Sequence, residues 1–371
     1  MWFCLTFSIK AQNNKKRALK ESALFYYLKG GIIMRKWVFV LLVGMIAASG
    51  GMAMFRIGMT AIVDHPALEA TREGVIDELV RRGFVLGSDF TVEFQSAQGN
   101  MTTAVAIANY FRSNQFDLVV AISTPSAQTC ANAIKDIPVV FTAVTDPVDA
   151  ALIPSLGKNP GNVVGVSDMT PVRTQFQLIR LVVPEARKVG ILSNPGETNS
   201  LVTVAHARAA CEELGFDLVE IPGSNTSEMI AALTATVGQI DALYVGTDNT
   251  AASCIETLHR IALSNKVPMI SGFFTLARSN GVISYGFEYY NLGLDTGTIV
   301  WNLLHGKPVS EIESRLMNAN ALLLLVDLDA AKEIELSIPD ILLARADYLV
   351  VNGVQNRTRD SGLSTSVKNG H

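Results

Sequence analysis

Polar side chains that could bind a small charged molecule gather where apolar segments of this sequence end. After the apolar residues 118–122 and 138–142 come four hydroxyls and a carboxylate: Ser123, Thr124, Ser126, Thr145 and Asp146. In the second half of the chain, the turn at residues 246–249 supplies Asp248 and Asn249. Hydroxyls near a helix start suit an anionic group such as a carboxylate, and an aspartate suits a cation.

Several of these residues have a purely structural alternative. Thr124 or Ser126 could cap the helix that follows. Asp146 precedes Pro147 and could instead form a turn. Asn194, Glu197 and Asn199 stand around the start of a predicted helix that ends at Leu214, where an acidic residue also stabilises the helix itself. Both interpretations stay open at this level.

The elements that must position these side chains alternate between strand and helix. The central stretch, residues 116–147, reads as apolar strand, helix of small residues and apolar strand. Continuous apolar strands separated by helices predict a parallel sheet with both faces covered. Ligands of such sheets lie outside the carboxyl ends of the strands, where the polar loops are expected.

The chain also repeats itself. Residues 240–272 follow the same order as residues 116–147, and Gly58 and Gly83 have the same spacing as Gly190 and Gly215. Two similar α/β halves predict two lobes with a cleft between them. The alternative is that any α/β protein shows such echoes.

Charge separates the N-terminal residues from the remainder. The formal net charge is −4, but residues 1–53 hold eight Lys or Arg and one acid, which leaves −11 for the rest. A folded part this acidic argues against binding to nucleic acid or to an anionic membrane surface.

Residues 34–53 are typical of a secretory signal peptide. Arg35 and Lys36 precede an apolar run of 11 residues, 38–48, and small residues follow, with cleavage expected near Ala53. This predicts a periplasmic or other extracytoplasmic location; an uncleaved anchor is the alternative. Residues 1–33 precede the signal, so we interpret them as a start-site artefact, with translation beginning at Met34.

The remaining cysteines, Cys130, Cys211 and Cys254, fit buried free thiols, although one disulfide stays open. No motif of a hydrolase, zinc protease or nucleotide-binding loop occurs, so neither an enzyme nor a metal or other cofactor is predicted. The polar residues 351–371 predict a disordered tail.

Further segments carry a family resemblance: residues 64–68 (DHPAL), 121–128 (AISTPSAQ), 141–148 (FTAVTDPV), 165–168 (GVSD), 194–197 (NPGE), 247–250 (TDNT) and 289–293 (YYNLG). With these, the chain resembles ABC-transporter substrate-binding proteins of the tryptophan/tyrosine-transport type, which have the type I periplasmic binding protein fold. The resemblance covers about 55–350. It departs from the family after Ile270, where Ser271, Gly272 and two phenylalanines replace polar or acidic residues.

The resemblance implies two lobes, 55–166 plus 289–317 and 167–288 plus 318–350, that close on a small molecule and deliver it to a membrane permease. An aromatic L-amino acid such as Trp, Tyr or Phe is the expected ligand, and a monomer is expected. The carboxylate of this amino acid would contact the hydroxyls named above, and its ammonium would contact Asp248. The side chain would need an apolar slot, for which Phe273, Phe274, Tyr244 and Phe287 are candidates, although each could be core.

Asp64 and His65 could close the rim of the cleft, with a surface loop as the alternative. Two other functions remain: a ligand-sensing module for a membrane receptor, and a cytoplasmic regulator of the repressor type. The regulator would need a DNA-binding head, whereas the basic residues before Phe55 belong to the signal-like segment.

Overall fold

The computed structural model of the protein describes residues 54–273 and 281–358. The chain divides into two units, residues 1–53 and 54–371, and all described residues belong to the second. The predicted signal peptide, the predicted start-site artefact, Phe274 and residues 359–371 therefore lie outside the described residues.

One parallel sheet is built mainly from the first part of this unit, with strand order β2-β1-β3-β4-β6-β12-β5. Every pairing is parallel except that of β12 with β5. The strands are β1 (Phe55–Ala61), β2 (Phe90–Ser96), β3 (Leu118–Ile122), β4 (Val139–Val144), β5 (Gly157–Lys158), β6 (Val163–Ser167) and β12 (Glu313–Leu316).

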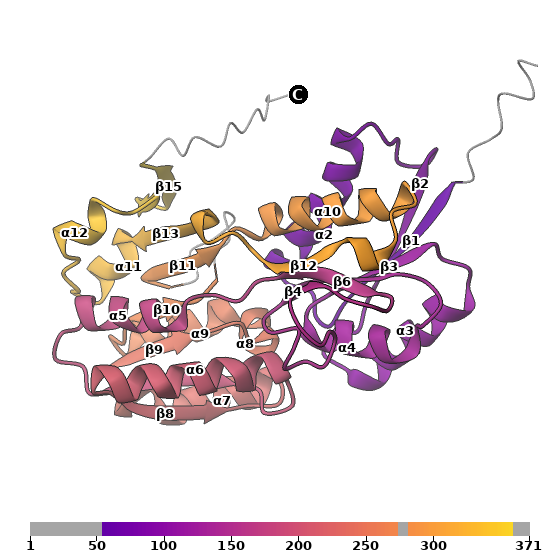
Figure 1. Cartoon of the computed structure of the whole chain (residues 1–371). Coiled ribbons are helices and arrows are strands. Elements are labelled where there is room, and N and C mark those ends of the chain that lie inside the picture. The colour runs from indigo at the N-terminus through magenta and orange to yellow at the C-terminus, as the bar shows by residue number, and fades with distance from the viewer. Residues whose placement is uncertain (1–53, 274–280, 359–371) are drawn as a thin grey trace, which may run out of the picture. The chain divides into compact units, whose positions relative to one another are not determined.

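Helices cover both faces of this sheet because its central strands are apolar on both sides. In β3, Leu118 and Val120 pack toward α2 (Pro66–Arg81) and α10 (Tyr289–Leu304). Val119 packs on the other face, toward α3 (Met101–Ser113) and α4 (Thr124–Ala133). Figure 1 shows these two helix layers above and below the sheet. The sequence prediction of a doubly covered parallel sheet is confirmed.

A second sheet has the order β15-β14-β13-β11-β10-β9-β7-β8, and it is parallel except at β11·β13 and β14·β15. Its strands are β7 (Lys188–Ser193), β8 (Asp217–Pro222), β9 (Ala242–Val245), β10 (Met269–Ser271), β11 (Ile283–Phe287), β13 (Leu322–Asp327), β14 (Tyr348–Val351) and β15 (Val354–Arg357). We call the part built on the first sheet the N-terminal lobe and the part built on the second sheet the C-terminal lobe.

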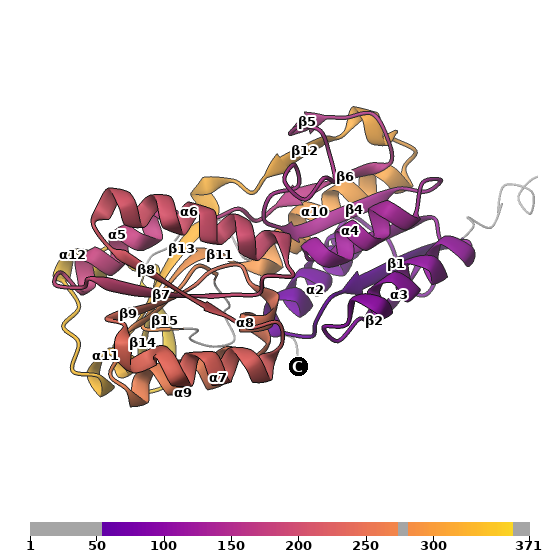
Figure 2. The ribbon, with the colours of Figure 1, turned by 90° about the horizontal axis from the view of Figure 1, so that it is seen from below.

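The C-terminal lobe is also layered. In Figure 2, α5 (Val172–Val182) and α6 (Thr198–Leu214) lie on one side of β7 and β9. On the other side lie α7 (Thr226–Thr236) and α9 (Ile255–Ser264). The remaining helices are short: α8 (Asn249–Ser253), α11 (Leu328–Glu333), α12 (Asp340–Leu343) and the 3₁₀ turns η1 (Val237–Gln239), η2 (Val309–Glu311) and η3 (Ala319–Ala321).

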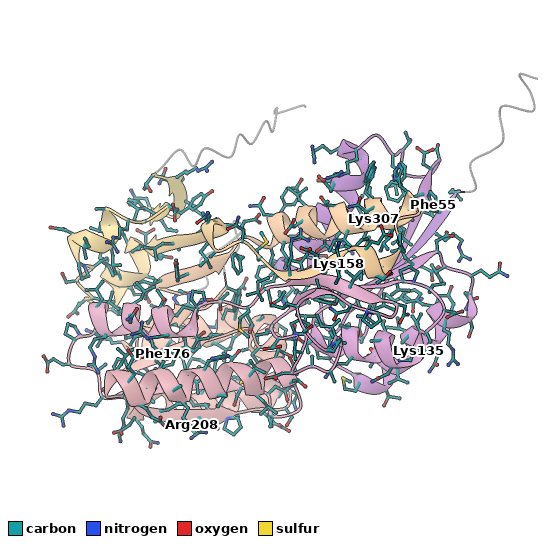
Figure 3. The ribbon with its side chains drawn as sticks, in the orientation of Figure 1. Phe55, Lys135, Lys158, Phe176, Arg208 and Lys307 are labelled. Carbon is teal, nitrogen blue, oxygen red and sulfur yellow. The ribbon has the colours of Figure 1, made fainter. Side chains whose placement is uncertain are left out.

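The core beneath α5 is aromatic. Phe176 of α5, labelled in Figure 3, is fully buried, and its ring centroid lies 4.9 Å from that of Tyr244 on β9. The Tyr244 hydroxyl donates a 2.6 Å hydrogen bond to Oε1 of Gln175. Tyr244, a sequence candidate for an aromatic slot, is therefore part of the core in this structure.

The chain passes between the two sheets three times, which is how two lobes are joined by crossing segments. The crossings are the residues between β6 and α5, Glu288 between β11 and α10, and the residues between β12 and β13. Because α10 follows one crossing directly, its first residue, Tyr289, lies beside the junction of the lobes.

Helices α2 and α10 cross at a contact that only glycine permits. A Cβ atom on Gly74 would lie 2.2 Å from the backbone oxygen of Tyr290, and one on Gly293 would lie 2.2 Å from that of Thr71. Backbone atoms cannot move aside as a flexible side chain would. The crossing thereby fixes the distance between α2 and α10.

The predicted disordered tail is wrong for its first residues, because β15 pairs with β14. Asn352 and Gly353 join the two strands with φ of 53° and 72°, the left-handed conformations that a two-residue hairpin turn requires. Their backbone N–H groups donate to the carboxylate of Asp329. A search for apolar periodicity misses this hairpin, whereas the Asn-Gly pair itself signals it.

Two further properties concern the described residues alone. Cys130 and Cys211 are buried free thiols and Cys254 is a partly buried one, so the prediction of unpaired cysteines is confirmed. Within residues 54–273 and 281–358, no helix has the length and hydrophobicity needed to cross a membrane.

Candidate ligand site

A small cavity of about 20 Å³ lies where the polar loops of both lobes meet. Its lining combines polar and apolar side chains: His65, Leu68, Ala143, Thr145, Asp168, Asn199, Thr247, Asp248, Asn249, Ala252, Phe273 and Tyr289. A larger recess of about 240 Å³ shares His65, Ala252 and Phe273 with it. A volume of about 20 Å³ holds roughly one water molecule, so a larger ligand would enter only if the lobes separated.

An irregularity in β4 aims the N-terminal lobe's contribution at this cavity. The pairing of β4 with β6 shifts register between Phe141 and Val144, and Ala143 there has a φ of 52°. Bulges of this kind bend a strand and redirect side chains next to functional sites. The following Thr145 consequently faces the C-terminal lobe, and its hydroxyl donates a 2.8 Å hydrogen bond to Thr247 Oγ1.

A second hydrogen bond joins the lobes at the edge of this region. Gln128 Nε2, on α4, donates to Thr198 Oγ1, the first residue of α6, over 3.2 Å. Neither lobe-joining bond involves a charged group. The contacts that hold the two lobes together here are therefore individually weak, about 1 kcal/mol each.

Asp248 lines the cavity, but backbone N–H groups already occupy both of its oxygens. Its Oδ1 accepts from Ala251 N (2.7 Å) and caps α8, and its Oδ2 accepts from Asn194 N (2.6 Å). Burial raises the pKa of Asp248. The helix predicted after this turn is in fact two helices, because α8 ends at Ser253 and α9 starts at Ile255.

Glu197 holds the same region from the next loop. Its Oε2 accepts from Asn249 Nδ2 (2.6 Å) and from Asn199 Nδ2 (3.0 Å). Burial, and then the nearby Asp248 carboxylate, raise the pKa of Glu197. The two acids thus share one buried network that shapes the C-terminal wall of the cavity.

Asp168 has a different environment. It follows β6 in the first crossing segment, and its Oδ2 accepts a 2.7 Å hydrogen bond from the hydroxyl of Tyr289. Its Oδ1 is buried without a hydrogen-bond partner, and so is Oδ1 of Asn199. Burial raises the pKa of Asp168 to about 6, against the lowering effect of the Tyr289 hydroxyl.

His65 lies at the mouth between the cavity and the recess. Its Nδ1 accepts from Ala67 N (3.2 Å) at the start of α2, so in the neutral ring the proton is on Nε2. Burial lowers the pKa of His65 to about 4. At neutral pH His65 is therefore an uncharged donor beside both spaces.

The structure brings six of the thirteen sequence-predicted site residues to the cavity: His65, Thr145, Asn199, Asp248, Asn249 and Phe273. Asp64 lines the recess alone. Six others line neither space: Ser123, Thr124, Ser126, Asp146, Asn194 and Glu197.

The six that line neither space have local roles or lie in the core. Ser123 Oγ donates to Ser126 Oγ over 3.3 Å. Asp146 Oδ1 accepts from Val148 N and Asp149 N, the turn that was the alternative for this residue. Thr124 is buried, and Asn194 Nδ2 donates to Thr250 Oγ1 over 2.8 Å. Phe287, another aromatic candidate, is buried in the core.

Sequence reasoning missed six lining residues: Leu68, Ala143, Asp168, Thr247, Ala252 and Tyr289. The sequence singles out Asp168 and Tyr289 only as parts of family-like segments, at 165–168 and 289–293. Both lie at the ends of segments that cross between the lobes. They contribute to the cavity from there, as the polar loops after other strands do. Among the described residues, no group of three or more acidic, histidine or cysteine side chains could hold a metal ion.

A family model described as ABC transporter substrate binding protein matches residues 56–350. The chain belongs to this family. Its members are solute-binding proteins, not enzymes, and the two-lobed type I fold predicted from the sequence is confirmed.

Relatives agree with this assignment. A tyrosine-binding protein of Clostridioides difficile is 38% identical over 256 residues, 69% of this chain and 74% of the relative. The ABC domain from Streptococcus pneumonia in complex with L-Trp is 29% identical, with a TM-score of 0.75 over 81% of this chain and 100% of that one. The ligand-free, open structure of an adhesive substrate binding protein from Clostridium difficile is 36% identical, with a TM-score of 0.58 over 77% and 96%.

Proposed function

We propose that this substrate-binding protein binds an aromatic L-amino acid, with Trp, Tyr and Phe as the candidates, and delivers it to an ABC permease. The observation that carries the proposal is the cavity itself. Polar residues of both lobes and of the crossing segments, such as Thr145, Asp168 and Asn199, surround it, and Phe273 supplies an aromatic wall. A tyrosine-binding relative and an L-Trp-bound neighbour support the choice of ligand.

Binding proceeds by closure of the lobes. The TM-score is higher against the L-Trp-bound structure (0.75) than against the ligand-free, open one (0.58), although the sequence is less similar to the former. This supports the interpretation that the arrangement described here is the closed one. A ligand that contacts both lobes gains its full affinity only in that state.

We keep the lobe boundaries predicted above, 55–166 plus 289–317 and 167–288 plus 318–350, and we place the mature protein outside the cytoplasm as a monomer. The signal-like sequence of residues 34–53 supports this location. N-terminal sequencing of the native protein tests it: a mature N-terminus near residue 54 is expected. A peptide from residues 1–33 would contradict a start at Met34.

A thermal-shift screen of residues 54–371 against the twenty amino acids, several sugars and purines tests the ligand. The protein is first unfolded and refolded to remove any ligand that copurified. A ligand at about 100 times its Kd adds about 2.7 kcal/mol to the free energy of unfolding. We expect a shift with Trp, Tyr or Phe, and a shift confined to sugars or purines would overturn the proposal.

A sensing role for a membrane receptor is the alternative to import. The fold supports both, because each needs only a closed, ligand-bound form with a surface that spans the lobes. Adding the ligand-bound protein to its permease in proteoliposomes separates the two. Ligand-dependent uptake and ATP hydrolysis are expected of an importer, and neither is expected of a sensor.

A further inference from the structure

Two residues that line the cavity each carry a buried oxygen without a hydrogen-bond partner: Asp168 Oδ1 and Asn199 Oδ1. The residues that carry them are 2% and 3% exposed. Within residues 54–273 and 281–358, no other side chain that lines this cavity has an unpartnered buried N or O atom. Buried polar atoms in folded proteins are almost always paired, so both oxygens indicate a missing donor.

Both atoms are acceptors, and their environment fixes that identity. Asn199 Nδ2 donates to Glu197 Oε2 (3.0 Å) and to the backbone oxygen of Thr247 (2.7 Å). Since both partners only accept there, the amide cannot be reversed, and Oδ1 is the atom that is left over. Asp168 uses Oδ2 for Tyr289 and has Oδ1 left.

The lining residues supply no cation to match them. Among the residues that the structure describes, the lining includes no lysine or arginine, and His65 is held neutral by burial. The Thr145 hydroxyl, which lines the same cavity, donates to Thr247, although it also lies near enough to Asp168 to lower the pKa of that carboxyl. Apart from one water molecule, for which the cavity has room, the donor that both oxygens lack would come with the ligand.

We propose that Asp168 Oδ1 and Asn199 Oδ1 together accept hydrogen bonds from the ammonium group of the ligand. This rests on the proposed function and adds to it the subsite that selects primary amines. A primary ammonium has three N–H donors and a positive charge, so it can satisfy both oxygens and pair with the carboxylate.

The position of the two oxygens links this subsite to closure. Asp168 belongs to a crossing segment after the N-terminal sheet, whereas Asn199 lies on α6 of the C-terminal lobe. Closing the lobes without a ligand buries both oxygens with at most one water molecule as donor, which leaves the carboxylate without a cation and is unfavourable. Closing them on an ammonium satisfies both, so the amine makes the closed state favourable.

Asp248, the carboxylate that the sequence favoured for this role, is already occupied. Each of its oxygens accepts from a backbone N–H. We therefore assign the ammonium to Asp168. If Asp168 binds it, replacing Asp168 by Asn weakens amino acid binding; if Asp248 bound it, that replacement would not.

Isothermal titration of the full mature chain tests the assignment with two matched probe pairs. L-Tryptophan is compared with indole-3-propionate, and L-tyrosine with 3-(4-hydroxyphenyl)propionate; the acid in each pair lacks only the amine. For Asp168→Asn we expect the affinity for the amino acids to fall about 100-fold, because a charge-assisted contact is lost. The affinity for the acids is expected to stay unchanged. Asp327→Asn, at a buried aspartate that caps α11 outside the cavity, is the control and should bind as the wild type does.

The inference is overturned if Asp168→Asn binds the amino acid like the wild type, or if the wild type binds the acid as tightly as its amino acid. The second result needs no variant, so it stands even where Asp168→Asn fails to fold. If the wild type instead binds a non-aromatic amine such as L-leucine and Asp168→Asn weakens it, the ammonium subsite holds and the aromatic ligand fails. If the wild type binds tryptophan tightly and Asp168→Asn leaves that binding intact, the aromatic ligand holds and the ammonium subsite fails.

Discussion

The hydroxyl of Tyr289 donates a 2.7 Å hydrogen bond to Oδ2 of Asp168, although 121 residues separate them in sequence. Each stands where the chain passes between the lobes: Asp168 after β6 and Tyr289 at the first residue of α10. The bond therefore ties two crossing segments to each other beside the cavity. It also leaves the carboxylate with one buried oxygen that has no hydrogen-bond partner.

Tyr289→Phe should weaken amino acid binding and raise the pH at which binding is lost. Without the phenol, both oxygens of Asp168 lack a donor, and the charged form of the carboxylate is less stable. We expect an affinity loss of about threefold to tenfold at pH 7.5, from one hydrogen bond. Titration calorimetry measures it. Tyr290→Phe is the control, because Tyr290 bonds Asp77 on an exposed face; an equal loss there would contradict the role of Tyr289.

Affinity for an amino acid should fall as the pH drops below about 6. Burial raises the pKa of Asp168 to about 6, and the protonated acid cannot pair with an ammonium. Each pH unit below that pKa should therefore cost up to about tenfold in affinity, while affinity is level above it. The ligand's own ammonium stays protonated across this range.

The described titratable residues that line the cavity with Asp168 are Tyr289 from α10, His65 before α2 and Asp248 before α8. Tyr289 has a pKa well above 10 and His65 one of about 4, so neither titrates between pH 5 and 8. Asp248 and its neighbour Glu197 have raised pKa values and could add a second step. The Asp168→Asn variant distinguishes these titrations, because it removes only the loss of affinity that is due to Asp168. An unchanged pH profile in that variant would contradict the assignment.

Thr145→Val and Thr247→Val should each weaken ligand binding by about threefold to tenfold. Either change removes the 2.8 Å hydrogen bond between the lobes, which is worth about 1 kcal/mol in the closed state. The double variant should lose little more than each single one, since all three lack the same bond. Fully additive losses would mean that the two hydroxyls act separately.

Gly74→Ala should lower the free energy of unfolding by at least about 1–3 kcal/mol, the usual cost of overpacking. The new Cβ would lie 2.2 Å from the Tyr290 backbone oxygen and force α2 away from α10. Gly238→Ala is the matched control, because nothing lies within 4 Å of its Cβ position. Thermal unfolding of both variants gives the comparison, and equal midpoints would refute the close crossing.

The fold could be predicted from the sequence to a large extent because its strands are apolar throughout and its helices have clear starts. The apolar segment 118–122 has the same bounds as β3. The hairpin at Asn352 was not predicted, since its second strand, β15, has no apolar pattern and only the turn dipeptide signals it. The break between α8 and α9 was not predicted either.

The site was harder to predict, because a sequence shows which polar residues follow strands but not which atoms are already satisfied. Asp248 and Asp168 both follow strands, and only their hydrogen bonds distinguish a helix cap from an open acceptor. Tyr289 reaches the cavity through the crossing from β11 to α10, which no local pattern shows.

Small-angle X-ray scattering of residues 54–371, with and without L-tryptophan or L-tyrosine, tests most directly the claim that the ligand joins the lobes. Ligand is first removed by unfolding, and binding is verified by calorimetry on the same sample. We predict a larger radius of gyration without ligand, and a smaller one with amino acid that matches the structure described here. Indole-3-propionate should leave the radius at its larger value. Identical scattering with and without a bound amino acid would contradict closure on the ligand.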